Sequence, residues 1–151
     1  IILKANSLVD DEIIDKLYEA STKGVQVDLI IRGICCLPTL EIGDSLNAIS
    51  IVDKYLEHAR VYYFHNNNHP ECYISSADLM VRNLDYRVEV AAPVLDKVKI
   101  RKVLKFLTIQ LQDNVKARLH NSNLSNPKRK IPSGKITRSQ IEIYQWLQNG
   151  G

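Results

Sequence analysis

The sequence predicts an α/β domain with a mostly parallel or mixed central sheet flanked by helices. Residues 1–5 are apolar and suit a buried strand, and Asp10 can cap a helix. Residues 25–37 form a nearly continuous apolar run rich in β-branched side chains, which suits a central strand covered on both faces. Strand, helix and strand within about 35 residues are typical of a βαβ unit, whose strands are parallel.

The first expected helix is amphipathic. Four apolar positions after the cap fall on one face: Ile13, Ile14, Leu17 and Tyr18. Gly24 is well placed to end the helix, because glycine readily adopts the left-handed conformation that follows a helix.

The expected elements that follow alternate in type. They are a loop over 38–49, a helix over 50–58, a strand over 60–64, a polar turn over 65–70, and strands over 72–76 and 86–90. Asp96 would cap a long helix whose apolar stripe runs from Ile100 to Leu111. A polar, basic loop over 120–135 and a terminal helix over 137–149 complete the chain, in which we find no internal repeat.

Composition and length fit one globular domain. The 151 residues are 45% hydrophobic and 25% charged, and the formal net charge of +3 suits an anionic ligand without requiring one. Three cysteines, an odd number with two adjacent, favour a reducing cytoplasmic compartment over a disulfide framework. No apolar run approaches the roughly 20 residues of a membrane-spanning helix, and no signal peptide is visible.

The chain begins at Ile1, without methionine and directly in an expected strand. We therefore expect a fragment of a longer protein. A processed or incompletely ordered chain is the alternative.

Arg32 and Gly33 are the first candidate site. Open parallel sheets bind ligands beyond the carboxyl ends of their strands. A guanidinium there can form a forked pair with phosphate oxygens, and glycine lets the backbone approach closely. The alternative is an ordinary strand-end arginine paired with a surface carboxylate.

His58 is the second candidate, with Arg60 two residues later. Histidine titrates near neutral pH and can donate or accept a proton, or attack phosphorus. The alternative is a histidine that packs at a helix end.

The segment 75–90 is the richest in polar groups. A strand leads small hydroxyl residues into a turn, and the expected strand over 86–90 would then place Arg87 and Glu89 on one side. Charged side chains on an inner face are costly unless paired or liganded. They either pair with neighbours or line a site, and an edge strand with a solvated face is the alternative.

His65, His69 and Cys72 have a spacing that could suggest a metal site. They lie in an asparagine-rich turn with no fourth ligand nearby. We predict a loop without metal.

Several stretches in order resemble the carboxy-terminal domain of bacterial polyphosphate kinase, a family whose fold resembles phospholipase D. The resemblance rests on residues 6–10, 29–37, 50–52, 56–58 and 75–90, continues to about 118 and resumes at 138–140. The turn at 75–78 and Glu89 are also similar to the phospholipase D pattern. In that pattern a lysine stands two residues after the histidine, where this chain has Arg60, which speaks against diester hydrolysis.

The resemblance implies reversible transfer of the terminal phosphate of ATP to polyphosphate, with magnesium. The Mg²⁺ would be bound mainly with ATP or by the missing upstream domain. The phosphohistidine would form in that domain, since no residue here corresponds to it, so the fragment would be inactive alone. The longer protein would be a cytoplasmic homo-oligomer, peripheral at the inner membrane at most, without nucleic-acid partners.

By position, His58 matches the second essential histidine of the family. Arg32 and Arg87 match its phosphate-binding arginines. Supporting roles fall to residues of the same polar block: Ser76, Arg82, Asn83 and Glu89. The chain departs from the family at 38–40, 53–54 and Leu79. A phospholipase D-like phosphodiesterase and an assembly module without chemistry are the competing hypotheses.

Overall fold

The computed structural model describes residues 1–37, 45–121, 123, 125–129 and 134–151. Departures from the family at 38–40 lie outside these residues. The described strands are β1 (Ile2–Ala5), β2 (Val27–Ile31), β3 (Leu46–Ser50), β4 (Val61–Phe64), β5 (Glu71–Ser75), β6 (Ala91–Pro93) and β7 (Arg118–Leu119). The helices are α1 (Asp11–Thr22), α2 (Val81–Leu84), α3 (Lys97–Leu111) and α4 (Ser139–Gln148), and a 3₁₀ turn covers Asn66–Asn68.

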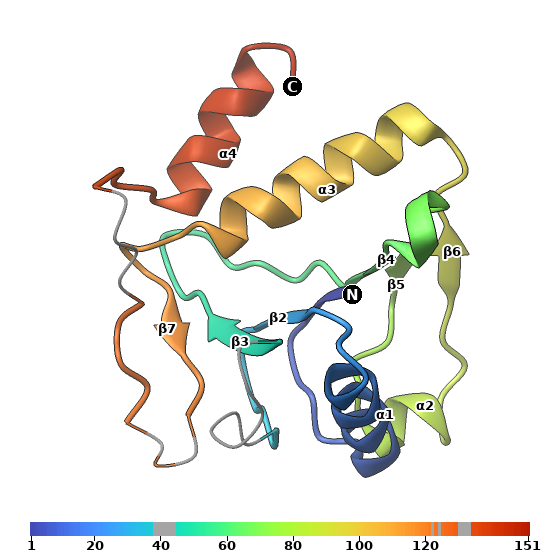
Figure 1. The fold of residues 1–151 in the computed structure, drawn as a ribbon. Helices are drawn as coiled ribbons and strands as arrows, with labels where there is room; N and C mark the ends of the chain where they lie inside the picture. Colours follow the sequence, from blue (N-terminus) through green and yellow to red (C-terminus); the bar gives the residue numbers. More distant parts are fainter. Residues whose placement is uncertain (38–44, 122, 124, 130–133) are drawn as a thin grey trace.

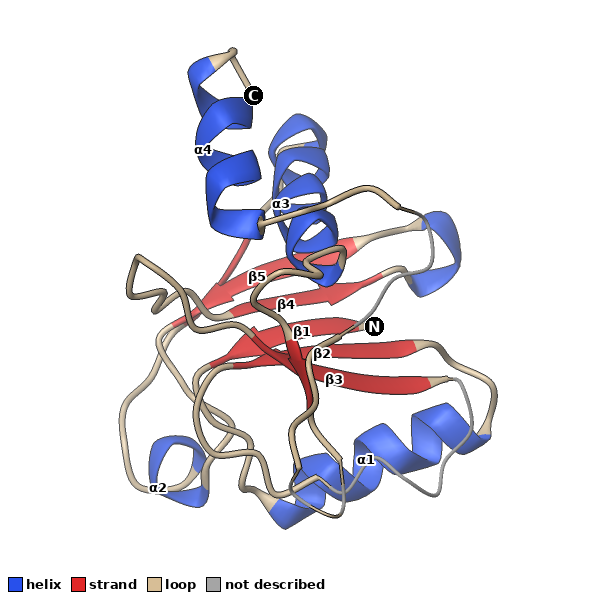
Figure 2. Cartoon of the chain, turned by 90° about the vertical axis from the view of Figure 1, so that its left-hand side faces the viewer, coloured by secondary structure: helices blue, strands red, loops and turns tan. Residues whose placement is uncertain are grey.

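The described strands form one mixed sheet in the order β6-β5-β4-β1-β2-β3-β7. The central strands β1, β2 and β3 are parallel, which the βαβ pattern predicts for β1 and β2 only, and the remaining strands pair antiparallel. Helices α3 and α4 lie on one face of the sheet, and α1 and α2 lie on the other (Figures 1 and 2). The architecture is therefore an α/β sandwich with helices on both faces.

Alternating side chains of β2 supply both halves of the core. Leu29 and Ile31 belong to the apolar cluster on the α1 face, and Ile30 belongs to the cluster that packs against α3. All three are at most 1% exposed. Burial on both faces explains why this strand is a continuous apolar run rather than an alternating one.

The predicted helix boundaries at α1 and α3 are confirmed. The Asp10 side chain accepts a hydrogen bond from the Ile13 amide at 3.0 Å, and Gly24 follows α1 with a φ of 84°. The Asp96 side chain accepts from the amide of Val98 at 2.7 Å. These caps satisfy main-chain donors that the first turn of a helix leaves unpaired.

The predicted helix over 50–58 is wrong. Strand β3 covers Leu46–Ser50, which also replaces part of the loop expected over 38–49, and residues 51–60 have no regular structure. Likewise β2 ends at Ile31 instead of continuing to Leu37. Contacts with distant segments hold both stretches: main-chain hydrogen bonds with Leu8 hold residues 34–36, and side chains at the start of α4 hold residues 53–55.

The predicted strand over 86–90 is also wrong. The short helix α2 precedes this segment, the segment itself is irregular, and the strand β6 begins only at Ala91. Val88 is 100% exposed and Tyr86 is 81% exposed. The alternating apolar pattern therefore marks solvent-facing side chains, which have no sheet or core to face.

Candidate functional site

Six strands begin or end at the carboxyl edge of the sheet, by which we mean the side where the parallel strands β1, β2 and β3 end. Strands β1 and β2 end there in parallel, β4 begins there, β5 ends there and β6 begins there, because the antiparallel partners run in opposite directions. Strand β3 also ends at this edge, since it is parallel to β2. Side chains just outside these strands therefore converge, although they come from positions spread over most of the chain.

Asp78 lies at the centre of this edge and is 8% exposed. Its Oδ1 accepts from the main-chain amides of Asn6 at 2.7 Å and Ser7 at 3.3 Å. Its Oδ2 accepts from Asn6 Nδ2 at 3.3 Å and from Arg60 Nη2 at 2.9 Å. Burial, the largest influence, would raise the pKa of Asp78, but these donors outweigh it and lower the pKa.

Arg32 is held by the same group of residues. Its Nη2 donates to Asn6 Oδ1 at 2.9 Å, so Asn6 stands between Arg32 and Asp78. The Arg32 Nε lies buried without a hydrogen-bond partner among the described residues. Gly33 follows directly, and a Cβ there would come within 2.9 Å of the Asn6 carbonyl oxygen. A side chain at this position would therefore collide with the main chain just after β1, which lies beside β2.

His58 is exposed, and its ring is contacted by Arg60. Arg60 Nη2 lies 3.1 Å from His58 Nε2, and Arg60 Nη1 donates to the His58 carbonyl at 3.4 Å. Because a guanidinium can only donate, this contact is a hydrogen bond when Nε2 is the acceptor. The histidine is therefore oriented by an arginine that is itself paired with Asp78.

Glu89 forms a second group of contacts with the turn after β5. Its carboxylate accepts from the hydroxyl of Ser76 and from Asn83 Nδ2, the latter at 2.7 Å. The Ser76 hydroxyl also accepts from the Val90 amide at 3.0 Å. Ser76 and Asn83, followed by the positive charge of Arg87, lower the pKa of Glu89 and keep it ionised.

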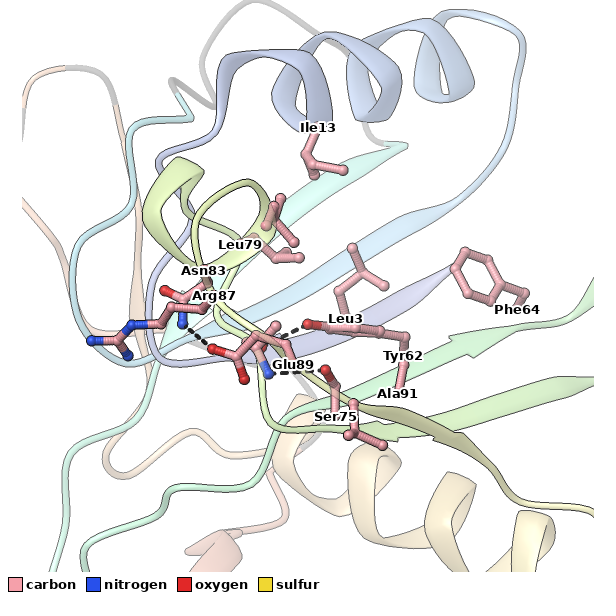
Figure 3. A pocket seen from close by; sticks show the side chains of 13 residues that line it. Leu3, Ile13, Tyr62, Phe64, Ser75, Leu79, Asn83, Arg87, Glu89 and Ala91 are labelled. Atoms are coloured by element: carbon pink, nitrogen blue, oxygen red, sulfur yellow. Dashed lines mark hydrogen bonds between the residues drawn. The ribbon is translucent and has the colours of Figure 1, made fainter.

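A cavity of about 390 Å³ lies beside this second group (Figure 3). Its walls are mostly apolar and include Leu3, Tyr62 and Leu79, while Asn83 and Glu89 supply polar atoms. The guanidinium of Arg87 points away from the apolar end of the cavity at Phe64. A pocket with an apolar wall and a few polar groups at one side is the usual form of a ligand site.

Arg82 and Arg87 are the exposed cations of this region. Within the described residues neither side chain makes a hydrogen bond or an ion pair, although Arg87 acts on Glu89 through its charge. Arg82 belongs to α2, and no contact joins it to the groups around Asp78 or Glu89. Of the residues predicted from the sequence, Arg82 is the one that the structure does not connect to the rest.

Contacts with α4 fix the irregular segment 51–60 that carries the histidine. Asp53 accepts two hydrogen bonds from the guanidinium of Arg138, at 2.6 and 2.8 Å. The Gln140 side chain bonds the main chain of Tyr55 in both directions, at 2.8 Å each. The start of α4 thereby replaces the hydrogen bonds that a helix or strand would have supplied.

Glu57, the neighbour of His58, is held from three elements. It accepts from Lys4 on β1 at 2.8 Å, from Gln140 on α4 at 2.9 Å, and from Gln110 on α3. The Lys4 and Glu57 side chains are only 5% and 15% exposed. Burial lowers the pKa of Lys4, while Glu57 opposes that shift. This buried pair joins the sheet to both helices next to the histidine in the chain.

Sequence reasoning did not single out Asn6, Asp78 or Glu57. The signal for Asn6 and Asp78 was present, because each is a polar residue just after an expected strand, and the two strands share an edge. Glu57 had no such signal, since its partners come from three other elements.

Among the residues that the structure describes, no three His, Cys, Asp or Glu side chains come together to hold a metal ion. His69 bonds the Asn67 carbonyl at 3.2 Å, and Cys72 is buried in the core on the α3 face. Within the same described residues, every helix is too short or too polar to span a bilayer.

These observations define an α/β domain with an ionic site at the carboxyl edge of its central parallel strands. The family model for polyphosphate kinase C-terminal domain 2 matches residues 1–140. The chain belongs to this family, as the resemblance of its motifs indicates.

The chain is similar to polyphosphate kinases along nearly its whole length. It is 49% identical over 153 residues to polyphosphate kinase of Escherichia coli (strain K12) and 46% identical over 151 residues to that of Vibrio cholerae serotype O1. Each match covers 99% of this chain and 22% of the relative. The chain thus spans about a fifth of the length of these curated relatives.

The solved structures agree. The crystal structure of polyphosphate kinase from Porphyromonas gingivalis superimposes with a TM-score of 0.94 at 44% identity, covering 99% of this chain and 23% of that one. The predicted α/β fold of the phospholipase D kind, with a mixed sheet and flanking helices, is confirmed.

Proposed function

We propose that this chain is a phosphate-holding part of a polyphosphate kinase, which transfers the terminal phosphate of ATP reversibly to polyphosphate. The proposal draws on the family and on the names of its long relatives. The observation that carries it is the convergence of Arg32, His58 and Glu89 at one sheet edge, linked by hydrogen bonds or charge to Asp78 and Arg60.

The reaction divides between this domain and the rest of a longer chain. A histidine outside this chain attacks the terminal phosphorus of ATP, the bond to the ADP oxygen breaks, and ADP leaves. An oxygen of the polyphosphate end then takes the phosphoryl group from that histidine. Each step moves one phosphoryl group without oxidation, and positioning with charge neutralisation supplies most of the catalysis.

Each predicted site residue has a role in this scheme. Arg32 and Arg87 neutralise phosphate oxygens, for which a forked cation is well suited. His58 donates or accepts a proton at the oxygen that leaves or attacks. Ser76 and Asn83 hold Glu89, and Arg82 adds positive charge at the rim.

Mg²⁺ enters this scheme with the nucleotide phosphates or through the rest of the longer protein. The described residues offer no cluster of ligands for it. It would screen negative charge on the phosphates, and no role of the residues above depends on its position. All three cysteines are free, which fits the reducing cytoplasm expected for such an enzyme. We propose assembly into a homo-oligomer on the family resemblance alone.

The decisive experiment compares His58→Ala with His69→Ala in the full-length polyphosphate kinase that contains this domain. Loss of a general acid or base is expected to lower kcat for polyphosphate synthesis by about 100- to 10,000-fold. His69 lies in the turn at the opposite end of β4 and β5 and serves as the matched control, with unchanged rates expected.

An equal response of the two variants would contradict the role of His58. Cleavage of a simple phosphodiester by the wild-type protein, abolished in His58→Ala, would instead favour the phosphodiesterase hypothesis. Calorimetric titration with polyphosphate at two salt concentrations, with an Arg32→Ala/Arg87→Ala variant alongside, tests phosphate binding separately. We expect saturable, salt-sensitive binding that the double variant loses.

A further inference from the structure

Asp78 is placed to control two functional side chains at once. One series of contacts runs from Asp78 through Asn6 to Arg32, with 3.3 Å between Asp78 Oδ2 and Asn6 Nδ2 and 2.9 Å between Asn6 Oδ1 and Arg32 Nη2. The other runs through Arg60 to His58, with distances of 2.9 and 3.1 Å between the bonded atoms. No other described residue joins these two groups by hydrogen bonds.

The contacts of Asp78 divide according to whether they need its charge. The main-chain amides of Asn6 and Ser7 need only an acceptor oxygen, which a neutral amide would also provide. Arg60, in contrast, is a cation whose side chain is 12% exposed, opposite an Asp78 side chain that is 11% exposed. A cation so little exposed needs a compensating charge.

The pairing also decides where Arg60 can point. Arg60 lies within electrostatic range of Glu89 as well as of Asp78. A guanidinium without Asp78 would be free to turn toward Glu89 or toward an incoming phosphate, and either move would withdraw it from the ring of His58. The negative charge of Asp78 is thus what keeps Arg60 in contact with the histidine.

We propose that Asp78 is a positioning residue that orients His58 through Arg60 and Arg32 through Asn6. The inference rests on the proposed function, because it assigns Asp78 a purpose only if these two side chains act on phosphate. It also explains why a buried carboxylate stands in the turn after β5, where a neutral residue could satisfy the main chain.

The test is a double-mutant cycle in full-length polyphosphate kinase containing this domain, with Asp78→Asn, Arg60→Ala and both together. Asp78→Asn is expected to lower kcat about 100-fold, the scale of a small displacement of a reacting group. The KM for ATP should change less than about threefold, since the lost positioning of His58 and Arg32 stabilises the transition state and not bound ATP. In the Arg60→Ala background, Asp78→Asn should cost clearly less than about 100-fold, because only the series through Asn6 to Arg32 is left for it to disturb.

Matched controls separate positioning from mere structural support. Asp85→Asn removes an exposed carboxylate whose side chain makes no hydrogen bond within the described residues, and we expect it to leave kcat unchanged. Asn6→Ala breaks the other series without touching the ion pair. The loss of activity in Asn6→Ala should not multiply with that of Arg32→Ala. If Asp78→Asn does not fold, this cycle still tests whether Arg32 is positioned through Asn6, and failure of that link would overturn the inference.

Multiplicative losses in both cycles, or a loss of Asp78→Asn that falls equally on KM and kcat, would overturn the inference. The proposed function fails differently. If His58→Ala and Arg32→Ala both retain full activity, the site itself is wrong. If both are impaired while the cycles are multiplicative, only the role of Asp78 is wrong.

Discussion

The two sides of the site differ in how their charges are held. In the paired half, made of Asn6, Arg32, His58, Arg60 and Asp78, Arg60 forms an ion pair with Asp78, and Arg32 is held by a hydrogen bond to Asn6. In the open half, residues 81–90, two arginines point into solvent and the main chain is largely irregular. Groups fixed beforehand stabilise a transition state without reorganising, whereas exposed cations mainly attract and retain a polyanion.

The support beneath the paired half provides the largest expected effect. Glu57→Ala removes the partner of Lys4, whose side chain is 5% exposed, and leaves a buried cation uncompensated. We expect a loss of about 3–5 kcal/mol in the free energy of unfolding. Thermal or denaturant unfolding of the protein, followed beside its kinetics, measures this loss.

Glu19→Ala is the matched control for that prediction. Glu19 pairs with Lys16 and Lys23 on the exposed face of α1, where ion pairs contribute little, so its removal should leave the unfolding midpoint unchanged. Adding Lys4→Met to Glu57→Gln should recover much of the lost stability, because the buried charge disappears. Equal shifts for Glu57→Ala and Glu19→Ala would show that the buried pair is not what supports this half.

Acid provides an intermediate effect at Asp78 in the paired half. The pKa of Asp78 is lowered in the folded protein, so its contribution to stability is present above the ordinary carboxyl pKa of about 4 and is lost as pH falls through the folded-state pKa. Each unit of lowering corresponds to about 1.4 kcal/mol.

Unfolding temperatures of wild type and Asp78→Asn measured between pH 7 and pH 3 check this sign. We expect the wild type to be the more stable at neutral pH and the difference to shrink below about pH 4. A constant difference across this range would mean that Asp78 contributes through its shape and not through its charge.

Local patterns predicted most of the fold. The caps at Asp10 and Asp96 and the apolar stripe of α3 depend on residues within a few positions of one another, and all are confirmed. The segment 51–60 was mispredicted because Arg138 and Gln140, some 85 residues away, determine its conformation. The segment 86–90 was mispredicted because alternation identifies a strand only when one set of side chains is buried.

The site residues differ in the same way, because some could be predicted from the local sequence and others depend on distant contacts. Arg32 and His58 were recognisable because each adjoins an expected strand and carries chemistry of its own. Asn6 and Asp78 act through a contact between residues 72 positions apart, which periodicity and spacing do not encode. Sequence reasoning therefore found the groups expected to touch phosphate, together with Arg60, but missed Asn6 and Asp78, which link them.

The open half provides the smallest and most selective effect. Arg87→Ala is expected to leave the unfolding temperature unchanged, because its side chain has no hydrogen bond or ion pair among the described residues. It should raise the KM for polyphosphate about 5- to 10-fold, the equivalent of one hydrogen bond with a net contribution of about 1 kcal/mol, with kcat within about twofold. Arg82→Ala should raise KM less, about twofold, as an exposed charge at longer range does.

Salt dependence distinguishes this effect from one in the paired half. The increase in KM for Arg87→Ala should shrink at high ionic strength, where exposed charges are screened. Lys105→Ala, which removes an exposed cation on α3, is the charge-matched control and should change neither constant. If Arg87→Ala instead lowers kcat as strongly as Arg32→Ala at unchanged KM, the open half is also fixed before the reaction. In that case the surface that fixes it must belong to the longer protein, because Arg87 makes no hydrogen bond or ion pair among the described residues of this domain.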